Sequence, residues 1–88
     1  MDLNTFLEQN PDWKQENCAL VGKFTFTDFS EVGAVVQKTI DLATELNHHP
    51  EVTFGFNIVK IVLTTHDAGN SITDLDIDFA KKFTARLL

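Results

Sequence analysis

The sequence predicts an α+β two-layer sandwich, in which a four-stranded antiparallel sheet carries helices packed on one face. Segments with apolar residues at three- and four-residue steps are interspersed with segments that are apolar at every second position, in the order α-β-β-α-β-β-α. Two pairs of consecutive strands, each flanked by helices, are typical of this architecture. The 88 residues fit one domain, which we expect to span residues 1–88.

A short helix is expected near the N-terminus, where Leu3, Phe6 and Leu7 have helical spacing after Asp2. The Asn10-Pro11 pair interrupts it, because proline disfavours helical backbone in the residue that precedes it. This helix should therefore be no longer than a few turns.

The segment from Cys18 to Thr27 alternates between apolar and polar residues, which predicts a β-hairpin with Gly22 at a turn or bulge. Cys18 is the only cysteine, so it can form neither an internal disulfide nor a thiolate metal site. We expect it to be a small core residue in a reducing compartment.

A long helix is expected to begin after Asp28, because Asp28-Phe29-Ser30-Glu31 has the form of a capping box. Pro50 is expected to end this helix. Its apolar positions predict one buried stripe, made of Val32, Val35, Val36, Ile40, Ala43 and Leu46.

Two more strands should follow, joined near Asn57, because alternating residues precede it and β-branched residues fill positions 58–65. Ile58 and Val62 should face away from the core, where another subunit would cover them. The residues expected to face the core are Val59, Ile61 and Leu63.

The last helix is expected to begin near Ser71 and Asp74, which could form a second cap. It should run to the C-terminus. The residues that share its apolar face are Ile72, Leu75, Phe79, Phe83 and Leu87.

The composition argues against several classes of partner. Seven basic and thirteen acidic residues give a net charge of −6, which repels nucleic acids and anionic membranes. No stretch approaches the roughly 18 to 20 apolar residues of a membrane span. We therefore expect a cytoplasmic protein and, because a domain this small buries little surface, a homo-oligomer.

The three histidines of the chain could form an acid–base site. His48 and His49 are adjacent near the end of the long helix, and His66 follows the last strand. In a two-layer sandwich these two ends can lie on the same rim. Imidazole titrates at about pH 6.5, so it can both take and give a proton near neutral pH.

Other roles are open on this pattern alone. His48 and His49 could complement the helix dipole, and His66 could be a turn residue. Three histidines also form a known zinc ligand set, although adjacent side chains tend to diverge. Acidic residues in the first turns of a helix are favoured there without any function, and this reading applies to most of the four that gather after His66: Asp67, Asp74, Asp76 and Asp78.

The motif Thr44-Glu-Leu-Asn-His-His-Pro50, then Phe56, Thr64-Thr-His-Asp-Ala-Gly69 and Asp76, resembles the pterin-4a-carbinolamine dehydratases. The segment Phe24 to Phe29 is similar to the stretch before the long helix of that family, and Trp13 lies where the family usually has a tryptophan. The resemblance covers nearly the whole chain, and a His-His-Pro motif with a distant Thr-His motif is specific.

The resemblance implies dehydration of a 4a-hydroxytetrahydropterin to the quinonoid dihydropterin, a reaction that needs no metal and no cofactor. The substrate would be a small pterin, and the resemblance implies a homodimer or homotetramer, the assemblies that the family commonly forms. The residues that match the catalytic positions of the family are His48, His49, His66 and Asp76. The residues that match its pterin-lining stretches are Asn47, Thr64, Thr65 and Asp67.

The chain departs from the family at three positions. Many members have an acidic residue at the position of Thr44, an aspartate at that of Asn47, and a tryptophan at that of Val52. These departures motivate an alternative function, in which a weakened or inactive member acts as a protein-interaction module for dimerisation.

Overall fold

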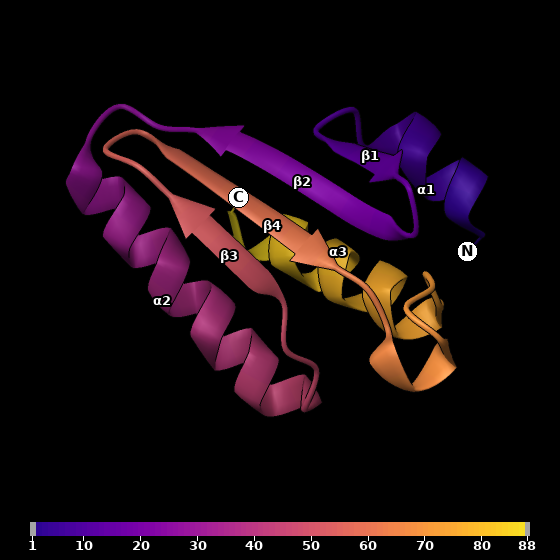
Figure 1. Cartoon of the computed structure of the whole chain (residues 1–88). Coiled ribbons are helices and arrows are strands. Elements are labelled where there is room, and N and C mark those ends of the chain that lie inside the picture. Colours follow the sequence, from indigo (N-terminus) through magenta and orange to yellow (C-terminus); the bar gives the residue numbers. More distant parts are fainter. Residues whose placement is uncertain (1, 88) are drawn as a thin grey trace.

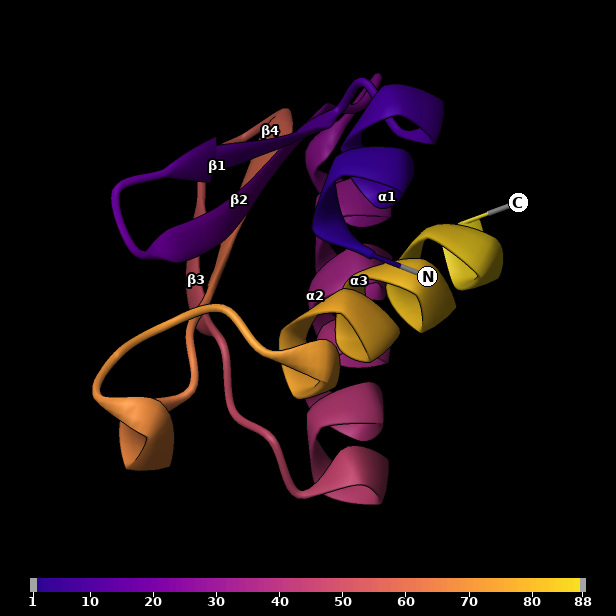
Figure 2. The same ribbon diagram turned by 90° about the vertical axis from the view of Figure 1, so that its right-hand side faces the viewer.

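The computed structural model describes residues 2–87 and confirms the expected order of helices and strands (Figure 1). The elements are α1 (Leu3–Gln9), β1 (Trp13–Glu16), β2 (Ala19–Thr25), α2 (Phe29–Leu46), β3 (Glu51–Phe54), β4 (Ile58–Leu63), the 3₁₀ turn η1 (His66–Ala68) and α3 (Asp74–Leu87). The strands form one antiparallel sheet in the order β1-β2-β4-β3. All three α-helices lie on one side of it (Figure 2), so the predicted α+β sandwich is confirmed. No helix within residues 2–87 has the length and apolarity needed to cross a membrane.

The core lies between the helices and the two central strands. Leu20 of β2 pairs with Leu63 of β4, and Phe24 pairs with Val59. Paired residues point to the same face, and all four side chains are buried. Val59, Ile61 and Leu63 are fully buried, as predicted.

The first hairpin differs from the prediction. Its turn lies at Asn17 and Cys18, where Asn17 has a φ of 55°, and Gly22 is inside β2. A Cβ atom on Gly22 would lie 2.8 Å from the Phe24 ring and 2.9 Å from the Trp13 ring. Gly22 is therefore needed for the close approach of two aromatic rings rather than for a turn.

Cys18 is exposed, so the prediction of a core position was wrong. It follows Asn17 in the tight turn between β1 and β2. The backbone carbonyl of Cys18 accepts a hydrogen bond from the Thr64 hydroxyl at 3.1 Å, which ties the hairpin turn to the end of β4.

The predicted capping box at the start of α2 is confirmed, except that Glu31 bonds to the residue before Asp28. Asp28 accepts from the backbone N–H of Glu31 at 2.9 Å, but the Glu31 carboxylate accepts from the N–H of Thr27 at 2.9 Å. The helix ends at Leu46, and Asn47 is left-handed with a φ of 49°. Asn47 therefore ends the helix before Pro50 is reached.

Two predicted core positions are on the surface instead. Ile40 is 53% exposed, and fully buried Leu42 lies toward the core in its place. Leu75 is 54% exposed, and Ile77 is buried in the corresponding part of α3. Both helices carry a wider apolar surface than they bury, so the spacing alone did not fix which residues face the sheet.

The predicted cap of α3 was placed two residues too early. Thr73 and Asp76 form it: the Thr73 N–H donates to the Asp76 carboxylate at 2.9 Å, and the Leu75 N–H donates to the Thr73 hydroxyl at 3.3 Å. Ser71 is used elsewhere, because its hydroxyl donates to the Ala68 carbonyl at 2.8 Å inside the preceding loop.

Candidate active site

A cavity of about 220 Å³ lies at one end of the sandwich, between the C-terminal end of α2 and the loop that follows β4. Both segments lie at the lower end of the molecule in Figures 1 and 2. All three histidines line the cavity. Its lining residues are Asn47, His48, His49, Thr64, Thr65, His66, Asp67 and Leu75. The structure thus brings together every site residue expected from the sequence except Asp76.

Asp76 lies behind the cavity wall and contacts His48. Its side chain is fully buried, and Oδ1 is 2.6 Å from His48 Nε2. Its Oδ2 accepts from the Thr65 hydroxyl at 2.8 Å and from the Thr73 N–H at 2.9 Å. A carboxylate with three donors around it is well compensated for burial.

This arrangement fixes one tautomer of His48. An ionised carboxylate only accepts, so the hydrogen of the neutral ring is on Nε2 and Nδ1 is an acceptor. Nδ1 makes no hydrogen bond with the described residues, and no buried side-chain nitrogen or oxygen among them lacks a partner. Nδ1 is therefore accessible. The His48 side chain is 13% exposed and its ring packs at an angle against Phe79.

Two threonine hydroxyls extend the network. Thr65 Oγ1 is 2.7 Å from Thr73 Oγ1. The single hydroxyl hydrogen of Thr65 is donated to Asp76, so Thr73 is the donor in this pair. The network thus joins three segments: the residues after α2, the end of β4 and the start of α3.

The other two histidines are more exposed. His66 Nδ1 is 2.6 Å from the side-chain oxygen of Asn70. His49 lines the cavity without a hydrogen bond to another described side chain. Within residues 2–87 there is no group of three or more histidine, cysteine or acidic side chains placed to hold a metal ion.

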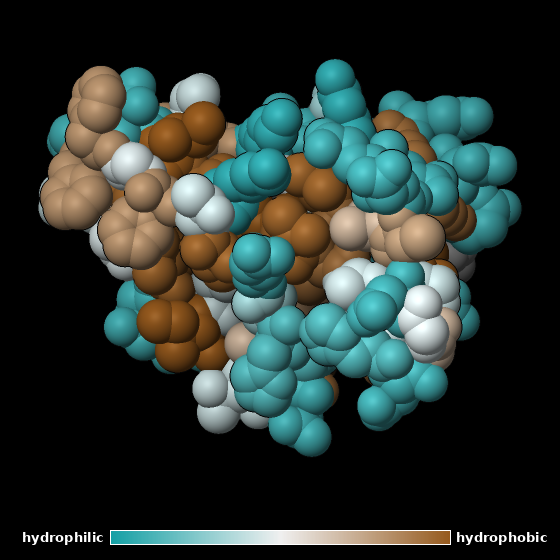
Figure 3. Space-filling model, in the orientation of Figure 1, coloured by the Kyte–Doolittle hydropathy of each residue, from teal (hydrophilic) through white to brown (hydrophobic). Residues whose placement is uncertain are grey.

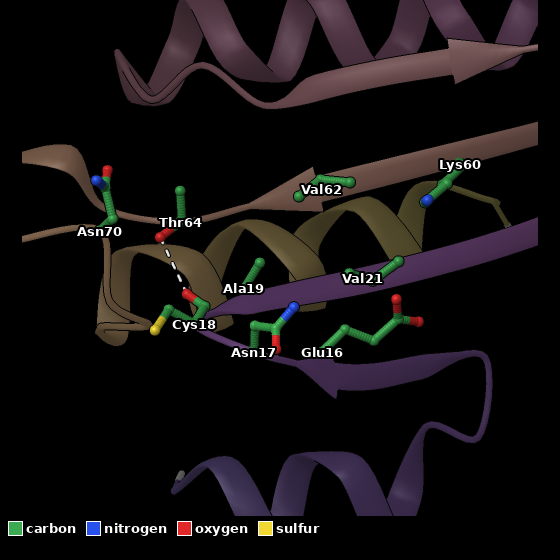
Figure 4. Close-up of a pocket in the computed structure, with 9 residues that line it drawn as sticks. All are labelled: Glu16, Asn17, Cys18, Ala19, Val21, Lys60, Val62, Thr64 and Asn70. Carbon is green, nitrogen blue, oxygen red and sulfur yellow. Dashed lines mark hydrogen bonds between the residues drawn. The ribbon is translucent and has the colours of Figure 1, made fainter.

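A larger hollow of about 330 Å³ lies on the open face of the sheet (Figure 4). It shares Thr64 with the histidine cavity but contains no histidine. The lining residues are Glu16, Asn17, Cys18, Ala19, Val21, Lys60, Val62, Thr64 and Asn70. The histidine cavity is smaller, but only it gathers groups that exchange protons near neutral pH.

Sequence reasoning missed three residues of this region. Thr73 follows no motif that distinguishes it from Ser71, and Asn70 lies in a segment that reads as an ordinary turn. Leu75 was assigned to the core by its helical spacing, but it lines the cavity. Only the folded arrangement places these side chains beside the histidines.

Comparison with known proteins identifies the fold and the family together. The family model described as pterin 4 alpha carbinolamine dehydratase matches residues 1–86. The chain belongs to this family. A relative from Thermomicrobium roseum is 41% identical over 78 residues, which cover 89% of this chain and 83% of the relative. A relative from Sulfurisphaera tokodaii is 41% identical over 86% of this chain and 81% of its own length. Both carry the name "Putative pterin-4-alpha-carbinolamine dehydratase".

Two solved structures of pterin dehydratase type have the same fold. The transcriptional coactivator/pterin dehydratase from Brucella melitensis superposes with a TM-score of 0.85 at 33% identity, covering 94% of this chain and 89% of that one. A pterin dehydratase-like protein described as a RuBisCO assembly factor in the alpha-carboxysome has a TM-score of 0.68 at 22% identity, with 83% of each chain covered. The second likeness concerns the fold alone.

Proposed function

We propose that this chain dehydrates a 4a-hydroxytetrahydropterin to the quinonoid dihydropterin. The proposal rests on one observation: His48, His49 and His66 line one cavity, and the buried Asp76 carboxylate forms a hydrogen bond with His48. In this reaction a proton leaves a ring nitrogen, the nitrogen electron pair forms a double bond to C4a, and the 4a-hydroxyl leaves as water. No oxidant or reductant is needed.

His48 is the best candidate for the base. Its free Nδ1 can take the ring proton, and the Asp76 carboxylate, 2.6 Å from Nε2, stabilises the positive charge that forms on the imidazole. Asp76 does not line the cavity, so it is a positioning residue that acts through His48. Among the described residues, His49 and His66 have no carboxylate within hydrogen-bond distance, and in its protonated form either ring has an N–H that can donate to the departing hydroxyl.

The cavity suits a small flat ring. Its volume of about 220 Å³ is below the range of about 300–1,000 Å³ that is common for drug-sized ligands. Leu75 offers an apolar wall, and Asn47, Thr64 and Asp67 offer polar groups for the edges of the heterocycle. Thr65 lines the cavity too, but its hydroxyl hydrogen is committed to Asp76.

A dehydration assay with purified protein and freshly generated carbinolamine tests the proposal. His48→Ala and His66→Ala should each lower kcat by about 10²–10⁴-fold, because each removes a positioned proton-transfer group. Lys81→Ala, an exposed change on α3, is the matched control and should leave the rate unchanged. Circular dichroism shows whether each variant is folded.

The assay is run with and without a chelator, since a metal-dependent reaction would lose activity on chelation. Wild-type rates in folded His48→Ala and His66→Ala proteins would remove both residues from the mechanism. A wild-type protein that does not accelerate the reaction above its rate in buffer would contradict the proposed function as a whole.

A second function is favoured by one feature, the apolar open face of the sheet. Val21 and Val62 are paired on this face, and Ile58 is 38% exposed there. Figure 3 shows hydrophobic surface across the middle of the face, between hydrophilic groups. An interaction module of the same family would use such a face. Full dehydratase activity in a protein that forms no stable complex would argue against this alternative.

A further inference from the structure

The loop that carries His66 is a closed, hydrogen-bonded unit. The Thr65 N–H donates to the Ser71 carbonyl at 2.9 Å, and the Thr65 carbonyl accepts from the N–H groups of Ala68 and Asn70 at 3.2 and 3.1 Å. The Gly69 N–H donates to the His66 carbonyl at 3.1 Å. The backbones of His66 and Asn70 are thus held in a fixed relation, so a contact between their side chains costs little further ordering.

That contact selects one nitrogen of His66. An amide oxygen has no hydrogen to donate, so the 2.6 Å distance from His66 Nδ1 to Asn70 Oδ1 requires the ring hydrogen on Nδ1. Nε2 is then the acceptor of the neutral ring. His48 is arranged in the opposite sense, with its hydrogen on Nε2 and its acceptor on Nδ1.

We propose that Asn70 is a positioning residue, which holds His66 in the Nδ1–H tautomer with Nε2 free for the substrate. The kinetic consequence rests on the proposed function, but the tautomer does not. His48 and His66 would then differ in a defined way: His48 has a buried carboxylate partner, and His66 has a neutral amide partner near solvent.

Asparagine meets two requirements at this position. Its φ is 59°, in the left-handed region, which asparagine tolerates better than most residues and glycine adopts freely. Glycine would satisfy the backbone equally well but would leave His66 without a partner. The substitution Asn70→Gly therefore removes the amide without straining the loop.

The direct test is nitrogen NMR of protein labelled with ¹⁵N-histidine. Spectra are recorded at about pH 8, where an ordinary imidazole is neutral. In the wild type, His66 should show a protonated Nδ1 and an unprotonated Nε2. Asn70→Gly should shift His66 toward a mixture of both tautomers, whereas Asn70→Asp, which keeps an acceptor at this position, should preserve the wild-type pattern. A wild-type His66 protonated at Nε2, or a pattern unchanged in Asn70→Gly, would overturn the proposal.

The kinetic test compares kcat and KM for the same variants. Asn70→Gly should lower kcat about tenfold, the equivalent of one hydrogen bond lost, with a smaller effect on KM. The matched control is Asn17→Gly, because Asn17 is also left-handed, with a φ of 55°, and lies in a different turn. It should change neither the His66 tautomer nor kcat.

An unchanged kcat in Asn70→Gly would overturn the positioning role even if the tautomer shifts. If the wild type has no dehydratase activity, the proposed function fails, but the NMR result still decides whether Asn70 fixes the His66 tautomer. The two failures are therefore distinguishable.

Discussion

The carboxylate of Asp76 has two roles in the structure that a sequence motif would assign to separate residues. It caps α3 through the Thr73 N–H, and it accepts from His48 in the cavity wall. The cap was expected at Ser71 with Asp74, but Thr73 and Asp76, which have the same spacing, form it in the structure. Local pattern cannot choose between them. The hydrogen bonds that Thr65 and His48 donate to the Asp76 carboxylate favour the cap at Thr73 and Asp76, and both donors come from other parts of the chain.

Asp76→Asn should therefore affect activity more than the fold. An amide places one acceptor and one donor where three donors converge, so at least one hydrogen bond is lost and His48 is no longer held with its hydrogen on Nε2. We expect kcat to fall by about 10²–10⁴-fold and the free energy of unfolding by about 1.5–3 kcal/mol.

The measurements are the dehydration rate, urea unfolding and the ¹⁵N pattern of His48. Asp78→Asn is the control, because Asp78 lies on the same helix with a side chain that is 49% exposed and, among the residues described, forms an ion pair only with Lys82 at the surface. A variant Asp76→Asn with the wild-type rate and the wild-type His48 tautomer would show that the buried carboxylate does not position this ring.

Gly22 gives a second prediction, on stability. Gly22→Ala places a Cβ within 2.8–2.9 Å of the Phe24 and Trp13 rings, so it should lower the free energy of unfolding by about 1–3 kcal/mol. Gly33→Ala is the matched control, because nothing lies within 4 Å of the added atom on α2. It should raise that free energy by about 0.5–1 kcal/mol, since alanine is the better helix former. Urea denaturation compares the two variants, and equal effects would refute the packing argument.

Helices α2 and α3 are also tied at the surface. Arg86 donates to both carboxylate oxygens of Glu45, at 2.6 and 3.3 Å. The hydrogen bond from Arg86 holds the pKa of Glu45 below its usual value of 4.5. A carboxyl group with a lowered pKa in the folded state stabilises that state above its unfolded pKa, and this contribution is lost as the pH falls through the folded pKa.

The pair should therefore stabilise the protein at neutral pH and not in acid. The difference in urea midpoint between wild type and Glu45→Gln should favour the wild type at about pH 7 and shrink as the pH falls below the usual carboxyl pKa of 4.5. Added salt should reduce it as well, because both side chains are at the surface. A difference that persists unchanged at the acid pH would show that the carboxylate charge is not its source.

The patterns in the sequence predicted the helices and strands better than their faces and caps. The alternation in β4 identified Val59 and Ile61 as core residues, because a strand has only two faces. A helix surface is continuous, so Ile40 and Leu75 were assigned to the core although they are exposed. Which stripe of a helix is buried depends on how it is rotated against the sheet, and this is set by long-range packing.

The meeting of the histidines is a property of the topology. The sheet order β1-β2-β4-β3 places β4 in the centre, and Thr64 and Thr65 connect its end to His66 beside the end of α2. The order of segments along the chain allowed this convergence but did not require it. The three histidines were candidates from their residue type and their places in the predicted fold, and the family resemblance added Asp76, whereas Asn70 could be recognised only from its contact with His66.

The open face of the sheet bears on the assembly of the protein. Val62 lies in the centre of this face, paired with Val21 on β2 and with Glu51 on β3. An apolar centre with charged surroundings is typical of a surface that another chain covers. We therefore propose that this face contributes to a homodimer or homotetramer. Val62→Glu should dissociate the assembly, because its carboxylate would be buried beside that of Glu51 on the paired strand. Lys81→Ala on the helical side should not. Light scattering at micromolar concentration measures the mass of each protein, and a monomeric wild type would contradict the assembly outright.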